Sequence, residues 1–401
     1  MRQIDVTERR RRLAVRHGLW RPAQAGDPAE IARRLVALHA TDPATVYLSV
    51  HARSGPDVTV TQIEESLYER RDLIRMLAMR RTVFVVPAES VPVVQASTTD
   101  KIASDQRTLL LRLLPQAGVA DPASWLADVE RSVLRALAER GGTATAAQLS
   151  AAEPRLRTTV VMAAGKPYQA TQTLTSRVLF VLAAQGLIVR GRPVGSWLSQ
   201  QYRWSLAESW LPSPAQAAAA PGAAEPADAA AARTELARQW LTTFGPAPLA
   251  DLKWWTGWTM AQVKQAVGGL RLVEVDLGGS IGVALPDDLD STEDPGTWAA
   301  LLPALDPTVM GWSERSWFLG PHGKALFDTN GNAGPTIWLN GRIVGGWAQR
   351  AGGEIAIRLL EDVGADAVAL IEAQAERTGA WLGGVRVIPR FRTPTERALM
   401  P

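Results

Sequence analysis

Apolar residues along the chain recur first at helical and then at strand spacing, in a group that returns three times. In the first group Ile31, Leu35 and Leu38 recur as they do on the buried face of a helix. The pattern predicts helices over 6–17, 28–38, 45–52 and 61–67, then strands over 73–77 and 82–86. Helices followed by a β-hairpin are typical of a winged helix.

The same order of elements comes back twice, which makes it the architecture of the chain. The second group has predicted helices over 128–140, 145–152 and 174–185 and strands over 186–190 and 202–206. The third has helices over 233–244, 248–255 and 259–267 and strands over 272–276 and 280–284 around Gly278-Gly279. We therefore predict winged-helix units over 1–100, 101–211 and 233–290.

Two stretches do not follow this order. Residues 212–232 are nearly all Ala, Pro, Ser and Gly, so they are predicted to be a linker. Over 291–401 the sequence predicts a hairpin with Asn340-Gly341 at its turn, a strand over 354–359 and a helix over 365–378. The predicted fold is α+β and mostly helical, with three tandem winged helices and a small C-terminal α+β cap around a DNA-binding channel.

A polar cluster interrupts the first group. In Leu38-His39-Ala40-Thr41-Asp42-Pro43 the polar residues stand where one helix is expected to stop and Pro43 to open the next. Asp42 before a proline is also an ordinary helix N-cap, and both interpretations stay open. His39 is one of only four histidines, with His17, His51 and His322. Next to a core leucine it costs burial energy unless it is hydrogen-bonded.

The amino-acid composition argues against a membrane-spanning protein, a disulfide-bonded protein and a protein with thiolate metal sites. The 401 residues are 46% hydrophobic, enough for several cores, yet no apolar run reaches the roughly 18 residues of a membrane span. The chain has no cysteine, which excludes disulfides and thiolate sites, and the four histidines are scattered. We expect a cytoplasmic protein, at the nucleoid when acting, with no metal and no cofactor.

The basic residues are overwhelmingly arginine, since only five of the 43 are lysine. Arginine suits contacts with phosphates, although a genome rich in G and C gives the same bias. Because the net charge is only +3, any DNA contact must come from a localised stripe. The sequence also has no Gly-x-Ser-x-Gly elbow and no phosphate-binding loop of Walker type.

Four stretches together resemble the AlkZ-type winged-helix DNA glycosylases of bacteria. They are 38–43, Met79–Pro87, Ser199–Trp204 and Arg342–Trp347, and the similarity spans nearly the whole chain. The resemblance implies a monofunctional enzyme, acting as a monomer on double-stranded DNA, that hydrolyses the glycosidic bond of alkylated purines. It points to bulky N7-alkylguanine adducts of a genotoxic natural product, in DNA repair or antibiotic self-resistance. The alternative is a non-catalytic regulator of transcription with the same fold.

The resemblance also implies which residues act. Where the family has Gln-aliphatic-Gln or Gln-aliphatic-Asp, this chain has His39-Ala40-Thr41. His39 would then position or deprotonate the attacking water, losing activity as pH falls through a pKa near 6.5 if that pKa is unperturbed. Thr41 carries no charge, so Asp42 is the nearest candidate anion for an oxocarbenium-like transition state.

The β-hairpin of each predicted winged helix, its wing, is expected to be exposed and to contact DNA. The residues expected to bind DNA are Arg80, Arg81, Arg190 and Arg192 and, within the third resembled stretch, Gln200, Gln201 and Arg203. Trp254, Trp255 and Trp258 cluster in the third unit, where they form either an aromatic platform for a lesion or ordinary helix core.

Overall fold

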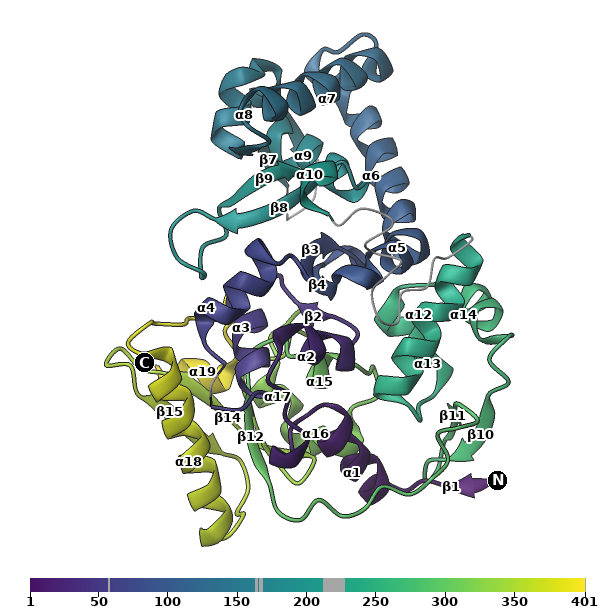
Figure 1. The fold of residues 1–401 in the computed structure, drawn as a ribbon, viewed down its shortest axis with the longest axis vertical. Helices are drawn as coiled ribbons and strands as arrows, with labels where there is room; N and C mark the ends of the chain where they lie inside the picture. Colours follow the sequence, from purple (N-terminus) through teal and green to yellow (C-terminus); the bar gives the residue numbers. More distant parts are fainter. Residues whose placement is uncertain (57, 163–164, 166–168, 212–227, 401) are drawn as a thin grey trace.

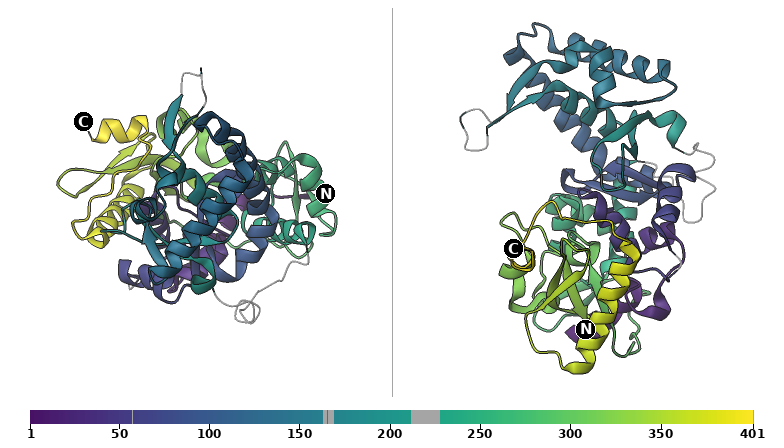
Figure 2. Two further views of the ribbon diagram at one scale, coloured as in Figure 1. Left: turned by 90° about the horizontal axis from the view of Figure 1, so that it is seen from above. Right: turned by 90° about the vertical axis from the view of Figure 1, so that its left-hand side faces the viewer.

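The chain folds into a large body with a smaller lobe above it (Figure 1). The computed structural model describes every residue except 57, 163–164, 166–168, 212–227 and 401. Helix α6 (Asp100–Leu113) runs from the body up into the lobe, and the side view shows the same two parts (Figure 2). The lobe holds the second predicted unit, and the body holds all the others.

The first unit differs from its prediction at the strand before the third helix. Its elements are α1 (Val6–Arg16), α2 (Pro28–Arg34), β2 (Leu38–His39), α3 (Pro43–His51), α4 (Val60–Glu64), β3 (Leu73–Leu77), β4 (Val83–Pro87) and α5 (Val91–Val94). The helix expected to reach Leu38 ends at Arg34, because Val36 takes a left-handed backbone with φ +64°. Leu38 and His39 instead pair with β4, giving a sheet of order β2-β4-β3.

The lobe repeats this arrangement. Its elements are α7 (Pro122–Glu139), β5 (Thr143–Thr145), α8 (Ala146–Ala152), β6 (Thr159–Met162), β7 (Ala170–Thr173), α9 (Leu174–Ala184), β8 (Ile188–Pro193), β9 (Tyr202–Leu206) and α10 (Ala207–Trp210). The sheet order β5-β9-β8 matches that of the first unit, and a separate apolar cluster forms its core. The β6-β7 hairpin was not predicted.

The third unit draws in the start of the chain. Its elements are α12 (Ala229–Phe244), α13 (Leu249–Thr256), α14 (Met260–Val267), β10 (Val273–Asp276) and β11 (Ile281–Ala284), and β1 (Arg2–Gln3) pairs in parallel with β10. Of the predicted linker, 212–227 lies outside the described residues. Its last residues are a helix, because the Asp228 carboxylate caps the N-terminus of α12.

The C-terminal part has the predicted hairpin, strand and helix. A four-stranded sheet runs β12 (Ala299–Leu302), β13 (Thr336–Leu339), β14 (Arg342–Gln349), β15 (Ile355–Leu359), with helices α15 (Pro307–Met310), α16 (Ser316–Leu319), α17 (Gly323–Leu326), α18 (Ala365–Leu382) and α19 (Pro394–Leu399). Asn340 and Gly341 both have positive φ, 48° and 79°, as the tight β13-β14 turn requires.

In the first unit and in the lobe a short strand, β2 after α2 and β5 after α7, pairs with the second strand of the later hairpin. In the third unit an isolated antiparallel pairing of Ala247 with Val283 takes the place of this short strand. The winged-helix assignment, the unit boundaries and the channel stay predictions. No described helix is long and apolar enough to cross a membrane.

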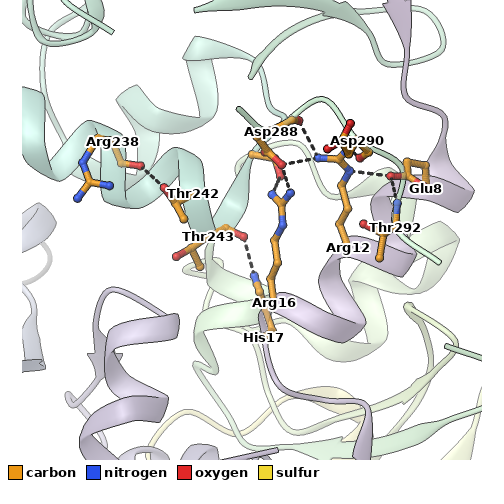
Figure 3. Close-up of polar contacts among 11 residues, drawn as sticks. Glu8, Arg12, Arg16, His17, Arg238, Thr242, Thr243, Asp288, Asp290 and Thr292 are labelled. Carbon is orange, nitrogen blue, oxygen red and sulfur yellow. Dashed lines mark hydrogen bonds and ion pairs between the residues drawn. The ribbon is translucent and has the colours of Figure 1, made fainter. Parts of the chain in front are cut away.

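Helix α1 is fixed to the body by arginines (Figure 3). Arg12, only 2% exposed, donates to the Asp288 carboxylate at 2.8 Å and to Glu8 at 2.9 Å, and Arg16 also pairs with Asp288. His17 donates from Nε2 to the Thr243 carbonyl of α12 at 3.2 Å. These contacts join the start of the chain to the third unit.

A buried ion pair fixes α3 to the C-terminal part. Arg53 donates to both carboxylate oxygens of Asp306, at 2.6 and 2.8 Å, and the two side chains are 1% and 0% exposed. Ser49 donates to the same carboxylate at 2.7 Å. Because Asp306 also caps α15, this cluster sets the position of α3 in the body.

Candidate active site

The three candidate catalytic residues lie in the short connection between β2 and α3. His39 pairs with Phe84 on β4, and the Ala40 amide donates to the Val83 carbonyl at 2.8 Å. Helix α3 begins at Pro43, whose fixed φ and missing N–H suit the first helical position. The connection is thus held by the sheet on one side and by a helix start on the other.

Asp42 is the N-cap of α3. Its Oδ1 accepts the Ala44 amide at 3.1 Å, and its Oδ2 accepts the Arg390 amide at 3.0 Å. The side chain is 7% exposed, and burial raises its pKa although both hydrogen bonds oppose that shift. Since both oxygens are occupied, the geometry favours the cap over an electrostatic role in catalysis.

The imidazole of His39 is buried and neutral. The residue is 4% exposed and its ring lies 4.9 Å from that of Phe84. Burial, helped by the charge of Arg80, lowers the pKa of His39 to about 3. The condition of an unperturbed pKa near 6.5 is therefore not met, because the ring has almost no solvent around it.

Thr41 determines which nitrogen of His39 carries the proton. The Thr41 amide donates to His39 Nδ1 at 3.4 Å, so the neutral ring keeps its proton on Nε2. The Thr41 hydroxyl is buried and has no hydrogen-bond partner among the described residues. The connection therefore has one N–H donor, and one hydroxyl that none of the described residues pairs with.

Arg80 and Arg81 lie in the turn between β3 and β4, both with left-handed φ, 53° and 61°. Arg81 is exposed as expected, whereas Arg80 is half-buried and its guanidinium lies 4.0 Å above the ring of Trp254 on α13. Arg315 contacts the same ring at 4.7 Å. Because its guanidinium packs on Trp254, Arg80 is not the free wing-tip charge that was expected, and burial lowers its pKa.

The tryptophans of the third unit divide between the two predicted roles. Trp255 and Trp258 are 5% and 6% exposed and belong to the main core, and Trp258 Nε1 donates to the Ser97 carbonyl at 3.1 Å. Trp254 is half-buried between the arginines. Only Trp254 is thus placed to contact anything outside the core.

The arginines of β8 are not free wing tips. Arg190 contacts the Trp204 ring at 5.1 Å, and burial lowers its pKa to about 10. Arg192 forms ion pairs with Glu64 at 3.0 Å and Glu69 at 2.8 Å. Both side chains already have partners inside the protein, because β8 lies in contact with β3 and with the turn after α4.

The other expected DNA contacts are exposed. Gln200 and Gln201 lie before β9, and Arg203 lies on it. Arg390 Nη1 donates to Gln200 at 3.4 Å, and the Arg390 amide donates to Asp42, so one residue links this loop to the candidate catalytic connection. Arg390 was missed, because nothing in hydrophobic periodicity marks a contact between residues so distant in sequence.

Glu396 was also missed, although its capping-box pattern was readable. It is fully buried, and its carboxylate accepts the amide and hydroxyl of Thr393 at 3.0 and 3.2 Å. Burial, with a contribution from the charge of Asp42, raises the pKa of Glu396 to about 7.

The described residues contain no group of three metal-binding side chains.

We predict that Asp42→Asn destabilises the fold and leaves the chemistry intact. An amide keeps only one acceptor oxygen, so an amino group faces either the Ala44 or the Arg390 N–H, which costs about 1–3 kcal/mol. Denaturant unfolding measures the loss, and single-turnover base release at low temperature measures the rate. A large fall in rate with unchanged stability would instead assign Asp42 an electrostatic role.

Comparison with known proteins places the chain in a family. A family profile described as DNA glycosylase AlkZ-like matches residues 32–381. Among solved structures, Streptomyces sahachiroi DNA glycosylase AlkZ has the same fold, with a TM-score of 0.70 and 20% identity over 95% of this chain and 98% of that one. No curated protein sequence matches. Because the profile spans most of the chain, including the β2-α3 connection, the chain belongs to the AlkZ-like DNA glycosylase family.

Proposed function

We propose that this glycosylase hydrolyses the N-glycosidic bond of alkylated purines, and in particular of bulky N7-alkylguanine adducts of a genotoxic natural product. The observation that carries the proposal is the β2-α3 connection, where a neutral imidazole and an unpaired hydroxyl lie within three residues of each other. DNA repair or self-resistance to such a product is the biological role that fits, with double-stranded DNA as the partner.

The chemistry suits a cationic lesion. An N7-alkylguanine already carries a positive charge, so the C1′–N9 bond breaks with its electron pair leaving on the base, and no acid is needed. Water then forms the C1′–O bond at the oxocarbenium-like centre and releases its proton to solvent. The protein must chiefly place that water, as preorganised hydrogen bonds do.

We assign His39 the positioning of this water. With Nδ1 occupied by the Thr41 amide, Nε2–H donates to the water oxygen, and the Thr41 hydroxyl accepts one of its hydrogens. A general base on Nε2 would need the other tautomer, which would set an N–H against the Thr41 amide. Positioning therefore fits the geometry better than deprotonation.

Base release is the direct test. Duplexes with a single N7-methylguanine or a bulky N7-adduct are incubated with enzyme and then treated with alkali, which cuts abasic sites. Strand cuts at the lesion are expected, and more from the bulky adduct if adducts are the natural substrate. A sequence-specific footprint without cuts would favour the regulator and overturn the proposal.

We predict that DNA affinity depends on two exposed arginines, Arg81 in the β3-β4 turn and Arg203 on β9. Arg81→Glu and Arg203→Glu each remove a candidate phosphate contact, so affinity should fall and the slope of log Kd against log salt should drop by about 1 per lost contact. Arg350→Glu, an exposed arginine of the C-terminal sheet, is the control. Unchanged slopes for Arg81 and Arg203 would remove both wings from the interface.

A further inference from the structure

A cavity of about 550 Å³ lies at the C-terminal end of α3, the end away from His39 and Asp42. It opens between α18, β12 and the turn that follows α1. Its volume is within the range of small-molecule sites. Nothing in the proposed excision chemistry uses it.

The wall contains a buried imidazole without partners. His51 is 4% exposed, and neither Nδ1 nor Nε2 has a hydrogen-bond partner among the described residues. Its ring stacks on Trp381 at 4.6 Å with an angle of 27° between the planes. Burial and the charge of Arg377 lower its pKa to about 3, so the ring offers one donor and one acceptor. Buried polar atoms normally have partners, and the residue that carries these two nitrogens lies in the wall of the cavity.

The rest of the wall is aromatic and cationic. Trp20, Trp298 and Trp381 line the cavity, and Leu370 is 39% exposed beside it. Arg21 and Arg377 also line it, close enough for the charge of Arg21 to lower the pKa of Arg377, and the lining residues that the structure describes include no aspartate or glutamate. Arg377 donates from Nη2 to the His51 and Ser54 carbonyls, at 3.0 and 2.6 Å. Its Nε and Nη1 can therefore donate to a ligand.

We propose that this cavity binds a small planar aromatic anion, whose ring packs between the tryptophans and whose carboxylate, sulfonate or phosphate faces Arg21 and Arg377. Aromatic walls bind flat rings, and two guanidinium groups on one wall favour an anion. His51 supports the aromatic wall by stacking on Trp381. Aryl acids and nucleoside monophosphates share this chemistry. The site does not depend on the proposed glycosylase substrate.

Fluorescence titration of the full chain tests this site with matched probes. 8-Anilinonaphthalene-1-sulfonate should bind with one-to-one stoichiometry and quench tryptophan emission, whereas N-phenyl-1-naphthylamine, which lacks the sulfonate, should bind at least tenfold more weakly. Competition by dGMP would identify nucleotides as ligands of the site, and competition by benzoate alone would identify aryl acids. Equal binding of the charged and uncharged probes would overturn the proposal.

Variants locate the binding. Arg21 is exposed and Ala380 lies at the mouth, so Arg21→Glu should weaken binding of the sulfonate at least tenfold and Ala380→Trp should fill the cavity and abolish it. Arg131→Glu, on an exposed face of α7, is the matched control and should bind as the wild type does. Circular dichroism verifies that each variant is folded. Binding unchanged in both Arg21→Glu and Ala380→Trp would place the probe elsewhere and overturn the proposal.

Discussion

Replacing His39 with alanine is expected to slow single-turnover base release on the order of 10²-fold or more, with little change in DNA affinity. The imidazole is buried at the β2-α3 connection, where we propose that its Nε2–H holds the attacking water. Single-turnover kinetics on an N7-methylguanine duplex measure the rate, and a binding titration measures the affinity. His322→Ala, a histidine paired with Glu361 far along the chain, is the matched control.

His39→Gln separates positioning from base catalysis. A glutamine amide can orient water but cannot take its proton, so a positioning role predicts that most of the rate survives in this variant, whereas a base role predicts a loss as large as that of alanine. Glutamine is also the residue that the resembled family has at this place.

The pH profile adds a second readout. With the pKa of His39 lowered to about 3, the ring stays neutral above pH 5, so the wild-type rate should show no inflexion from this histidine between pH 5.5 and 8. A fall in rate centred near pH 6.5 that disappears in His39→Gln would contradict both the buried imidazole and the role assigned to it.

Asp306→Ala is expected to cost about 3–5 kcal/mol of unfolding free energy, because it leaves the Arg53 guanidinium buried without its counter-charge. The pair holds α3 against the C-terminal part, so the loss should also lower the activity that remains at 37 °C. Urea unfolding monitored by tryptophan fluorescence measures the change.

Two comparisons sharpen that measurement. Asp128→Ala removes an exposed ion pair with Arg131 and should cost no more than about 1 kcal/mol. The double variant Arg53→Met with Asp306→Leu removes both charges and should recover part of the loss. A cost below about 1 kcal/mol for Asp306→Ala would mean that water reaches Arg53 and that the pair does not fix α3.

Local patterns predicted the elements well, because periodicity and caps act over a few residues. The helix of residues 365–378 and the Asn340-Gly341 hairpin are present, and Pro43 opens α3 as expected. The strand at Leu38 and His39 was missed, because a two-residue strand has no periodicity of its own and exists only through its pairing with β4.

The sequence predicted where the candidate site lies in the chain, but not the burial and hydrogen-bond partners of its side chains. The sequence grouped His39, Thr41 and Asp42, yet the burial of His39 against Phe84 and the second hydrogen bond of Asp42 depend on contacts outside any local pattern. Arg80 and Arg192 show the same limit, since their partners Trp254 and Glu64 lie more than a hundred residues away. Wing arginines look exposed in a sequence because their tertiary partners cannot be read there.

The parallel pairing of β1 with β10 bears on how the chain is made. Arg2 and Gln3 emerge from the ribosome about 270 residues before Val275 and Asp276, their partners in the sheet. At about 5–20 residues per second this leaves the first strand unpaired for roughly 15–55 s of translation. During that time the lobe, whose core draws only on residues 109–206, can fold by itself. The start of the chain therefore joins its sheet only after the lobe has been made, although it is the first segment to be synthesised.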